Sequence, residues 1–335
     1  MINRLNITAG DGAAGVIRAS PIDGDVLSWQ DLLFEGPVPT DLDLHGVSTC
    51  RAEYLSAAYP NERNQLVEVQ ERNRQFSNAG TYDQVILWFE HDLVDQLQLL
   101  QILDGFTDAC PSSLDLICID NHPGVAEFRG LGQLHPTQVP ALMDARAPIT
   151  DKQFALAQAG WTAFRSPDPR NVENLLDGDT TDLPFLAPAL TRHLEEFPSL
   201  PNGLGRTERQ LMELVAEGHR DPLVLFIENT ARESHLCIGD WSTFRRLAIL
   251  CDGPNPLLRC RPGPGFRHPP RDQLDIEIFR SQRLSLTVSG EEVLEGKADA
   301  TALKPTDHWL GGVHLRDGAP LWRWDRHNRE LIKTA

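Results

Sequence analysis

Three consecutive ionisable residues, Glu90, His91 and Asp92, end an apolar segment of the chain. Two carboxylates could act as bases and an imidazole titrates near neutral pH, so this group could carry out general acid–base catalysis. The preceding run, Val85–Phe89, has the composition of a fully buried strand, and an amphipathic stretch over residues 93–106 follows it at once. We therefore predict that the three residues lie at the carboxyl end of a strand in an open α/β sheet, where ligands bind.

Asp92 also has a structural interpretation. With Asp95 three residues further along, Asp92 can cap the amino terminus of the following helix. This interpretation leaves Glu90 and His91 unexplained, because a carboxylate buried without a partner costs several kcal/mol. Carboxylates beside an imidazole also suit Mg²⁺, Mn²⁺ or Zn²⁺, so a divalent metal is an alternative, although no second spaced set of His or Cys accompanies them.

A glycine pattern, Gly10-x-Gly12-x-x-Gly15, lies between a strand-like and a helix-like segment, with Asp31 about 20 residues further along. It matches the dinucleotide-binding fingerprint, in which backbone amides at a helix start bind phosphate. Asp11 would place a carboxylate where the pyrophosphate lies, which disfavours NAD in particular. The structural alternative is a tight turn in which Asp11 caps the helix by accepting amide hydrogen bonds.

Other ionisable and polar side chains follow the second and fourth predicted strands: Asp31, Glu35, Asp120, Asn121 and His122. In a parallel sheet these residues reach the same carboxyl edge as Asp11 and Glu90, and this convergence is stronger evidence than any single motif. Arg129, in the segment 129–133, could bind an anionic group of a substrate, or the segment could simply form a tight turn.

Strand and helix signals alternate along residues 1 to about 125. The predicted strands cover residues 5–8, 24–29, 85–89 and 114–120, and the predicted helices cover residues 10–18, 47–59, 64–76 and 93–106. This alternation predicts an α/β domain over residues 1–149, with a Rossmann-like or flavodoxin-like parallel sheet and helices on both faces. A capping box at Thr150–Gln153 opens a purely helical stretch, which predicts a helical linker over residues 150–204.

Residues 205–335 have the element order of a winged-helix domain. Three predicted helices (211–217, from 222, and 241–251) precede two predicted strands at residues 256–260 and 283–287. Near the end, Asp317-Gly318 predicts a hairpin between residues 309–315 and 321–325. Winged helices bind DNA or serve as rigid interaction modules. Six arginines of this region could meet phosphates: Arg245, Arg246, Arg259, Arg261, Arg267 and Arg271.

The net charge of −17 is unevenly distributed along the chain. From Gly205 onward 19 basic residues balance 19 acidic ones, so the whole excess lies before Gly205. An acidic surface repels a phosphate backbone, so any nucleic-acid binding is expected in the carboxy-terminal domain only.

The chain has the features of a cytoplasmic protein. Its six cysteines show no CxxC spacing, which indicates reduced thiols: Cys50, Cys110, Cys118, Cys237, Cys251 and Cys260. No apolar run approaches the roughly 18 residues of a membrane span. The first residues also lack the shape of a signal peptide.

Five segments resemble a known bacterial family: residues 7–11, 34–39, 87–93, 192–198 and 309–315. They are similar to the family called domain of unknown function eighteen-thirty-five, together with its usual carboxy-terminal companion domain. The resemblance spans nearly the whole chain and implies that both halves belong to one architecture. It implies no particular activity.

These observations lead first to an enzyme, a hydrolase or group transferase acting on a small, phosphorylated or nucleotide-like substrate. The predicted catalytic residues are Glu90, His91 and Asp11, with Glu90 or His91 as general acid or base. The predicted substrate-binding residues are Gly10, Gly12, Asp31, Glu35, Asp92, Asp120 and Arg129. The first alternative is a ligand-sensing regulator whose winged helix contacts DNA, and the second is a non-catalytic scaffold. The substrate and the oligomeric state are left open.

Overall fold

The computed structural model describes residues 2–59, 64–106, 111–236, 238–269 and 276–334. Three residues named above, Cys110, Cys237 and Arg271, lie outside these ranges. The chain forms two compact units: the first contains Met1–Leu190 with Trp309–Val313, and the second contains Thr191–His308 with His314–Ala335. The region predicted as a linker is thus divided between the two units at Leu190.

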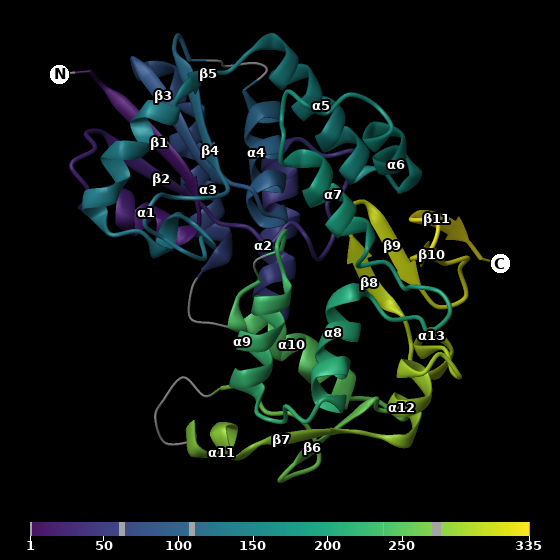
Figure 1. The fold of residues 1–335 in the computed structure, drawn as a ribbon. Coiled ribbons are helices and arrows are strands. Elements are labelled where there is room, and N and C mark those ends of the chain that lie inside the picture. Colours follow the sequence, from purple (N-terminus) through teal and green to yellow (C-terminus); the bar gives the residue numbers. More distant parts are fainter. Residues whose placement is uncertain (1, 60–63, 107–110, 237, 270–275, 335) are drawn as a thin grey trace. The chain divides into compact units, whose positions relative to one another are not determined.

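The first unit is built on a five-stranded sheet (Figure 1). Its strands are β1 (Arg4–Ala9), β2 (Asp25–Trp29), β3 (Gln84–Glu90), β4 (Leu114–Ile119) and β5 (Ala147–Pro148), in the order β2-β1-β3-β4-β5. The first four pair in parallel, and the two-residue β5 runs antiparallel to β4. The predicted α/β class with a parallel sheet is therefore confirmed, and β5 is an unpredicted addition at the sheet edge.

The β3 strand is apolar along nearly its whole length because both of its faces are covered. Successive side chains of a strand point to opposite faces. Ile86 and Trp88 belong to one hydrophobic cluster together with α1 (Gly10–Ala19). The helix α4 (Leu93–Gly105) packs against β3 and β1 and covers the other face (Figure 1).

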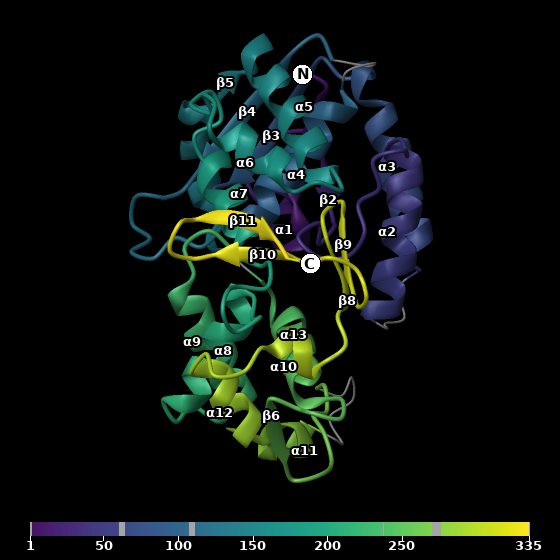
Figure 2. The same cartoon turned by 90° about the vertical axis from the view of Figure 1, so that its right-hand side faces the viewer.

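Further helical elements complete the two layers around the sheet. The helices α2 (Leu44–Ala58) and α3 (Gln65–Ser77) lie side by side (Figure 2). Two 3₁₀ segments, Leu131–Gln133 and Pro136–Ala145, follow β4 and pack on α1. Among the residues that the structure describes, no helix combines the length and the apolar character that crossing a membrane requires.

Two helices follow β5: α5 (Asp151–Arg165) and α6 (Arg170–Leu176). The predicted capping box at the start of α5 is confirmed. Thr150 accepts a hydrogen bond from the Gln153 amide at 3.2 Å, and the Gln153 side chain accepts one from the Thr150 amide at 2.9 Å. A β-carbon at Gly160 would lie 3.1 Å from Leu100, so glycine lets α5 approach α4 closely. This packing explains why residues 150–190 belong to the first unit.

The second unit begins at the carboxy-terminal end of α7 (Leu186–Leu194). It continues with α8 (Arg206–Ala216), α9 (Pro222–Arg232), α10 (Asp240–Cys251), β6 (Leu258–Arg261), α11 (Ile276–Ser281), β7 (Arg283–Leu286), α12 (Val288–Leu294) and α13 (Ala300–Leu303). The strands β6 and β7 pair antiparallel. One hydrophobic cluster, which includes Leu211, Phe244 and Leu258, joins the three long helices to this ribbon.

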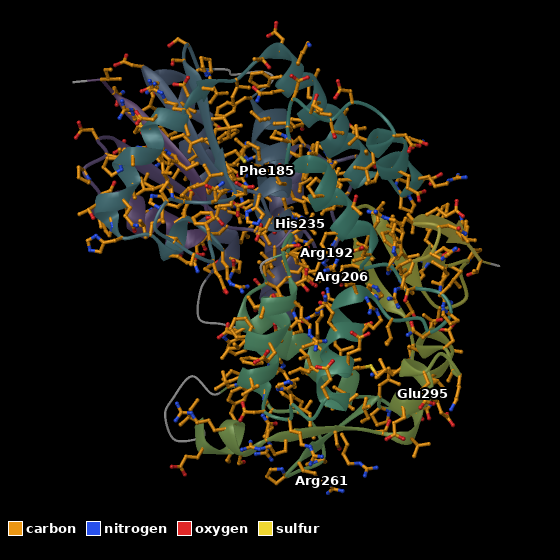
Figure 3. The ribbon with its side chains drawn as sticks, viewed as in Figure 1. Phe185, Arg192, Arg206, His235, Arg261 and Glu295 are labelled. Carbon is orange, nitrogen blue, oxygen red and sulfur yellow. The ribbon has the colours of Figure 1, made fainter. Side chains whose placement is uncertain are left out.

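A buried network of ion pairs crosses the second unit. The Arg192 side chain is 1% exposed and binds Glu196 at 2.7 Å and Glu233 at 2.8 Å. Arg206 lies 3.7 Å from Glu233, and Arg246 lies 3.1 Å from Glu196; Figure 3 shows Arg192 and Arg206 close together. Burial alone would raise the pKa of Glu196, but Arg246 and Arg192 outweigh it and hold that pKa well below its usual range. The network thus keeps its carboxylates charged and paired.

The carboxy-terminal strands pair differently from the prediction. The strand β8 (Asp307–Leu310) pairs with β9 (Val313–Arg316), and β10 (Trp322–Asp325) pairs with β11 (Glu330–Lys333). The predicted hairpin across Asp317-Gly318 is therefore wrong. Gly311, with a φ of +59°, makes a turn inside the segment that was predicted as one strand.

The turn at Gly311-Gly312 belongs to the first unit. The Gly311 carbonyl accepts a hydrogen bond from the Val38 amide at 3.1 Å, and the Gly312 amide donates to the Phe164 carbonyl at 3.1 Å. A β-carbon at Gly312 would overlap the Arg165 carbonyl, so only glycine allows this approach. The short segment is therefore an integral part of the first unit.

Candidate functional site

Parallel pairing brings the ends of β1, β3 and β4 to one edge of the first sheet. Thr8 pairs with Trp88, and Glu90 pairs with Ile119. The predicted convergence is therefore confirmed for the residues that follow these strands: Gly10, Asp11, Gly12, Glu90, His91, Asp92 and Asp120. We call this region the β1–β3 edge. The chain places β2 on one side of β1 and then places β3 on the other side of β1. Open α/β sheets bind ligands at the point between two such neighbouring strands, which is called the switch point.

Glu90 is the buried centre of the β1–β3 edge, with 8% of its surface exposed. The Leu131 backbone amide donates a hydrogen bond to one oxygen of the Glu90 carboxyl group. Gly130 lies directly beside the same carboxyl group, so close that a β-carbon there would collide with it. Gly130 also has a φ of +153°, which favours glycine. The loop after β4 thus contacts Glu90 through its backbone.

The environment of Glu90 changes its protonation. Burial raises the pKa of the Glu90 carboxyl group to about 8, with a further contribution from the Asp92 carboxylate and an opposing one from the Leu131 amide. A carboxyl group with this pKa holds its proton at neutral pH and can release it, which is the property of a general acid. Burial, Glu90 and Asp92 likewise raise the pKa of Asp95 well above its ordinary value.

The backbone of Glu90 is fixed by the first turn of α4. Asp92 accepts a hydrogen bond from the Asp95 amide at 3.0 Å, which confirms its predicted role as the helix cap. Asp95 in turn accepts one from the Glu90 amide at 2.9 Å, and Gln96 donates to the Glu90 carbonyl at 2.7 Å. Asp92 therefore shapes the turn between β3 and α4 and raises the pKa of its neighbour.

The start of α1 forms the other side of the β1–β3 edge. The helix begins directly after β1, with a turn at Gly10 (φ +70°), and Ala9 occupies the cap position without a side-chain hydrogen bond. Asp11 is exposed in the first helical turn, so it is not the cap that one interpretation predicted. A β-carbon at Gly12 would lie 3.9 Å from the Gly132 α-carbon. The backbone around Gly132 thus occupies part of the space beside Gly12 that a bound pyrophosphate would need.

Three further predicted residues flank Glu90. His91 is half-buried, and its ring meets the Phe185 ring edge-on with the centroids 6.2 Å apart. Asp120 is exposed and accepts a hydrogen bond from the Asn121 amide group. Arg129, just before Gly130, is half-buried and lies 3.4 Å from the carboxylate of Glu127. An imidazole, a carboxylate and a guanidinium group thus come from the segments that adjoin Glu90 and Gly130.

Asp31 and Glu35 make interactions within the fold instead. Arg51, which is completely buried, binds the Asp31 carboxylate at 2.8 Å and donates to the Glu35 carbonyl at 2.6 Å. The Tyr59 hydroxyl donates to the Glu35 carboxylate. A buried guanidinium group needs such partners. These interactions give Asp31 and Glu35 a structural role. We therefore do not propose Asp31 and Glu35 as substrate-binding residues.

Sequence reasoning missed several contributors to the β1–β3 edge. Asp95 was predicted only as a capping partner, although the Asp92-x-x-Asp95 spacing places a second carboxyl group beside Glu90. The segment 129–133 is predicted only to meet an anionic group or to form a tight turn, and the contact of Leu131 with Glu90 is not predicted, because it joins a backbone amide to a residue 41 positions away. Arg51 could have been found as a single arginine on the buried face of a predicted helix.

Comparison with known proteins adds no assignment to this site, since no family model and no curated protein matches the chain. In the ranges that the structure describes, no group of three or more His, Cys, Asp or Glu side chains is arranged to hold a metal ion.

Proposed function

We propose that the first unit is an enzyme, a hydrolase or group transferase, in which Glu90 is the general acid. One observation carries the proposal: a buried carboxyl group with a pKa of about 8 lies at the switch point of a parallel sheet. The strand order 2-1-3-4-5 is that of flavodoxin-like folds, which bind ligands at this point. Acids tuned toward neutral pH cluster at functional sites.

The neighbours of Glu90 support the other roles in this proposal. The His91 imidazole takes the proton of an attacking water or hydroxyl group, while Glu90 gives its proton to the leaving group. Proton transfer from His91 back to Glu90 then restores the starting state. Arg129 pairs with an anionic group of the substrate, and Asp11 orients its polar groups. A small phosphorylated or nucleotide-like substrate matches these residue types.

The test is hydrolysis of a panel of small phosphate esters and nucleotides by the full chain and by Glu90→Gln. Glutamine keeps the shape and can accept the Leu131 amide hydrogen bond, but it has no proton to give. We expect the rate on any hydrolysed ester to fall by about 10²- to 10⁴-fold. Glu53→Gln, at an exposed position of α2, is the control and should leave the rate unchanged. A wild-type rate in Glu90→Gln, or no turnover by the wild type, would contradict the proposal.

A second candidate function, a DNA-binding regulator, rests on the second unit. Three helices followed by an antiparallel ribbon are the order of a winged-helix domain. Arg259 and Arg261 alternate along the exposed face of β6, and Arg267 is exposed after it. Arg246, which was expected to meet phosphates, pairs instead with buried Glu196, and its side chain is 15% exposed. The β6 arginines are therefore the proposed contacts with the DNA backbone.

Duplex binding at several salt concentrations tests this candidate. Changing both Arg259 and Arg261 to glutamine should reduce the slope of log K against log salt by about 1.8, at about 0.9 for each lost phosphate contact. Arg316→Gln, an exposed arginine on β9, should leave the slope unchanged. The absence of duplex binding by the wild type at low salt would rule the regulator out.

A further inference from the structure

The second unit contains a cavity of about 510 Å³ with walls rich in arginine. Five arginines line it against two glutamates: Arg206, Arg209, Arg232, Arg326 and Arg329, with Glu195 and Glu213. We call this cavity the arginine pocket. Every lining residue belongs to the second unit. Its volume is within the range of roughly 300–1,000 Å³ that is typical of small-molecule sites.

One wall of the arginine pocket is a face of α8. Arg206, Arg209 and Glu213 recur at intervals of three and four residues, so they share one side of the helix. Leu211 and Leu214 lie on its other side, in the hydrophobic core. The arginines on the pocket face thus add nothing to the apolar core and are turned toward the cavity.

Another part of the lining comes from the turn between β10 and β11, which supplies Arg326 and Arg329. The Asp325 carboxylate accepts hydrogen bonds from the amides of His327 at 2.8 Å and Asn328 at 3.1 Å, which fixes this turn. Arg329 has a φ of +57°, a conformation that glycine or asparagine adopts far more readily. The Arg329 backbone amide donates a hydrogen bond to the Asp325 carbonyl at 2.7 Å, so this conformation closes the turn.

The positive charge of the arginine pocket exceeds its negative charge. Three arginines have carboxylate partners: Arg206 with Glu195, Arg209 with Glu213, and Arg232 with Glu217. The side chains of Arg326 and Arg329 form no ion pair with any residue that the structure describes. Partial burial and the charge of Arg209 lower the pKa of Arg326, and together they outweigh the opposing effect of the Glu213 and Glu195 carboxylates. Such a pocket attracts anions.

We propose that the arginine pocket binds a small ligand that carries two or more phosphate groups. The planar forks of Arg326 and Arg329 suit paired hydrogen bonds to phosphate oxygens. The five arginines of the lining outnumber its two glutamates, which suits a multiply charged anion. A concave site with Glu195 and Glu213 between its arginines is less suited to an extended nucleic-acid backbone, because the carboxylates would repel neighbouring phosphates. The proposal is independent of the chemistry at Glu90 and of duplex binding by β6.

The probe for this pocket is inorganic tripolyphosphate, titrated into the full chain by calorimetry, with orthophosphate for comparison. We expect tripolyphosphate to bind at least tenfold more tightly than orthophosphate, since it can meet several guanidinium groups at once. The variant with Arg326→Gln and Arg329→Gly should bind it at least tenfold more weakly. Glycine suits position 329 because it adopts the positive φ without strain. Arg316→Gln, outside the pocket lining, is the matched control and should bind like the wild type.

Three results would overturn the proposal. The first is no binding of tripolyphosphate by the wild type, and the second is wild-type affinity in the double variant. The third is a DNA duplex that binds more tightly than tripolyphosphate and loses affinity through the same two substitutions, since the ligand would then be a nucleic acid. Arg329→Gly alone is tested in parallel. It keeps the turn and should weaken binding severalfold, so the experiment stays decisive if the double variant fails to fold.

Discussion

Replacing Glu90 by glutamine should stabilise the first unit at alkaline pH. The carboxyl group has a pKa of about 8 in the folded protein, against an ordinary value of 4.5. The folded state therefore binds this proton more tightly than the unfolded state does. The stability that the proton provides is complete below the unfolded pKa and is lost as pH rises through the folded pKa. Glutamine never ionises and escapes this loss.

The size of the effect follows from the two pKa values. At about 1.4 kcal/mol for each pKa unit, the difference between the folded and unfolded pKa values corresponds to about 5 kcal/mol of folding free energy. About 4 kcal/mol of this stability is lost between pH 5 and pH 9. Only 8% of Glu90 is exposed, so solvent screening reduces this free energy little. In a unit of roughly 200 residues each kcal/mol moves the melting temperature by about 2–4 °C. We therefore expect Glu90→Gln to gain about 8–16 °C over the wild type across this pH range.

The assay is calorimetric unfolding of the wild type, Glu90→Gln and the control Glu53→Gln at three pH values, about 5, 7 and 9. The melting temperatures of the wild type and Glu90→Gln should be similar at the lowest pH and should separate as pH rises. The control should follow the wild type throughout. A constant difference, or a wild type more stable than Glu90→Gln at pH 9, would show that Glu90 is already ionised in the folded protein at neutral pH. The general-acid role would then be refuted together with the stability argument.

Two further substitutions have clear expected outcomes. Arg192→Met removes one guanidinium partner from each of the buried carboxylates of Glu196 and Glu233, so it should destabilise the second unit by about 3–5 kcal/mol in urea unfolding. A loss of stability below about 1 kcal/mol would contradict the paired network. Gly130→Ala forces a β-carbon against the Glu90 carboxyl group, so it should abolish turnover of any substrate found for the wild type. Gly15→Ala, at a helical position with open space, should leave turnover unchanged, and full activity in Gly130→Ala would show that the carboxyl position is unimportant.

Local patterns carried most of what the sequence predicted correctly. The apolar run Val85–Phe89 became the core of β3 because a strand buried on both faces needs apolar side chains at every position. Asp92 and Thr150 were recognised as helix caps because a cap bonds to amides only three residues away. Information of this kind lies within a few residues of sequence and needs no knowledge of the fold.

The remaining features depend on contacts between distant parts of the chain. The polar neighbours of Asp31 were not visible, because its partner Arg51 comes from a helix whose packing the sequence does not specify. Gly311 was read as part of a strand, although its turn is set by contacts with Val38 and Phe164. The arginine pocket combines α8 with a turn at Arg326, more than a hundred residues later, so no local window contains it.

The turn at Gly311-Gly312 bears on the order in which the protein can fold during synthesis. The first unit lacks its last segment until residues 309–313 have been made, and all of residues 191–308 leave the ribosome in between. At roughly 5–20 residues per second this interval lasts on the order of ten seconds. During that time the Phe164 carbonyl lacks the hydrogen bond from the Gly312 amide, and the Val38 amide lacks its acceptor, the Gly311 carbonyl. A chain cut after Leu190 would stay in that unfinished state, so the first unit should be expressed together with the residues that follow it.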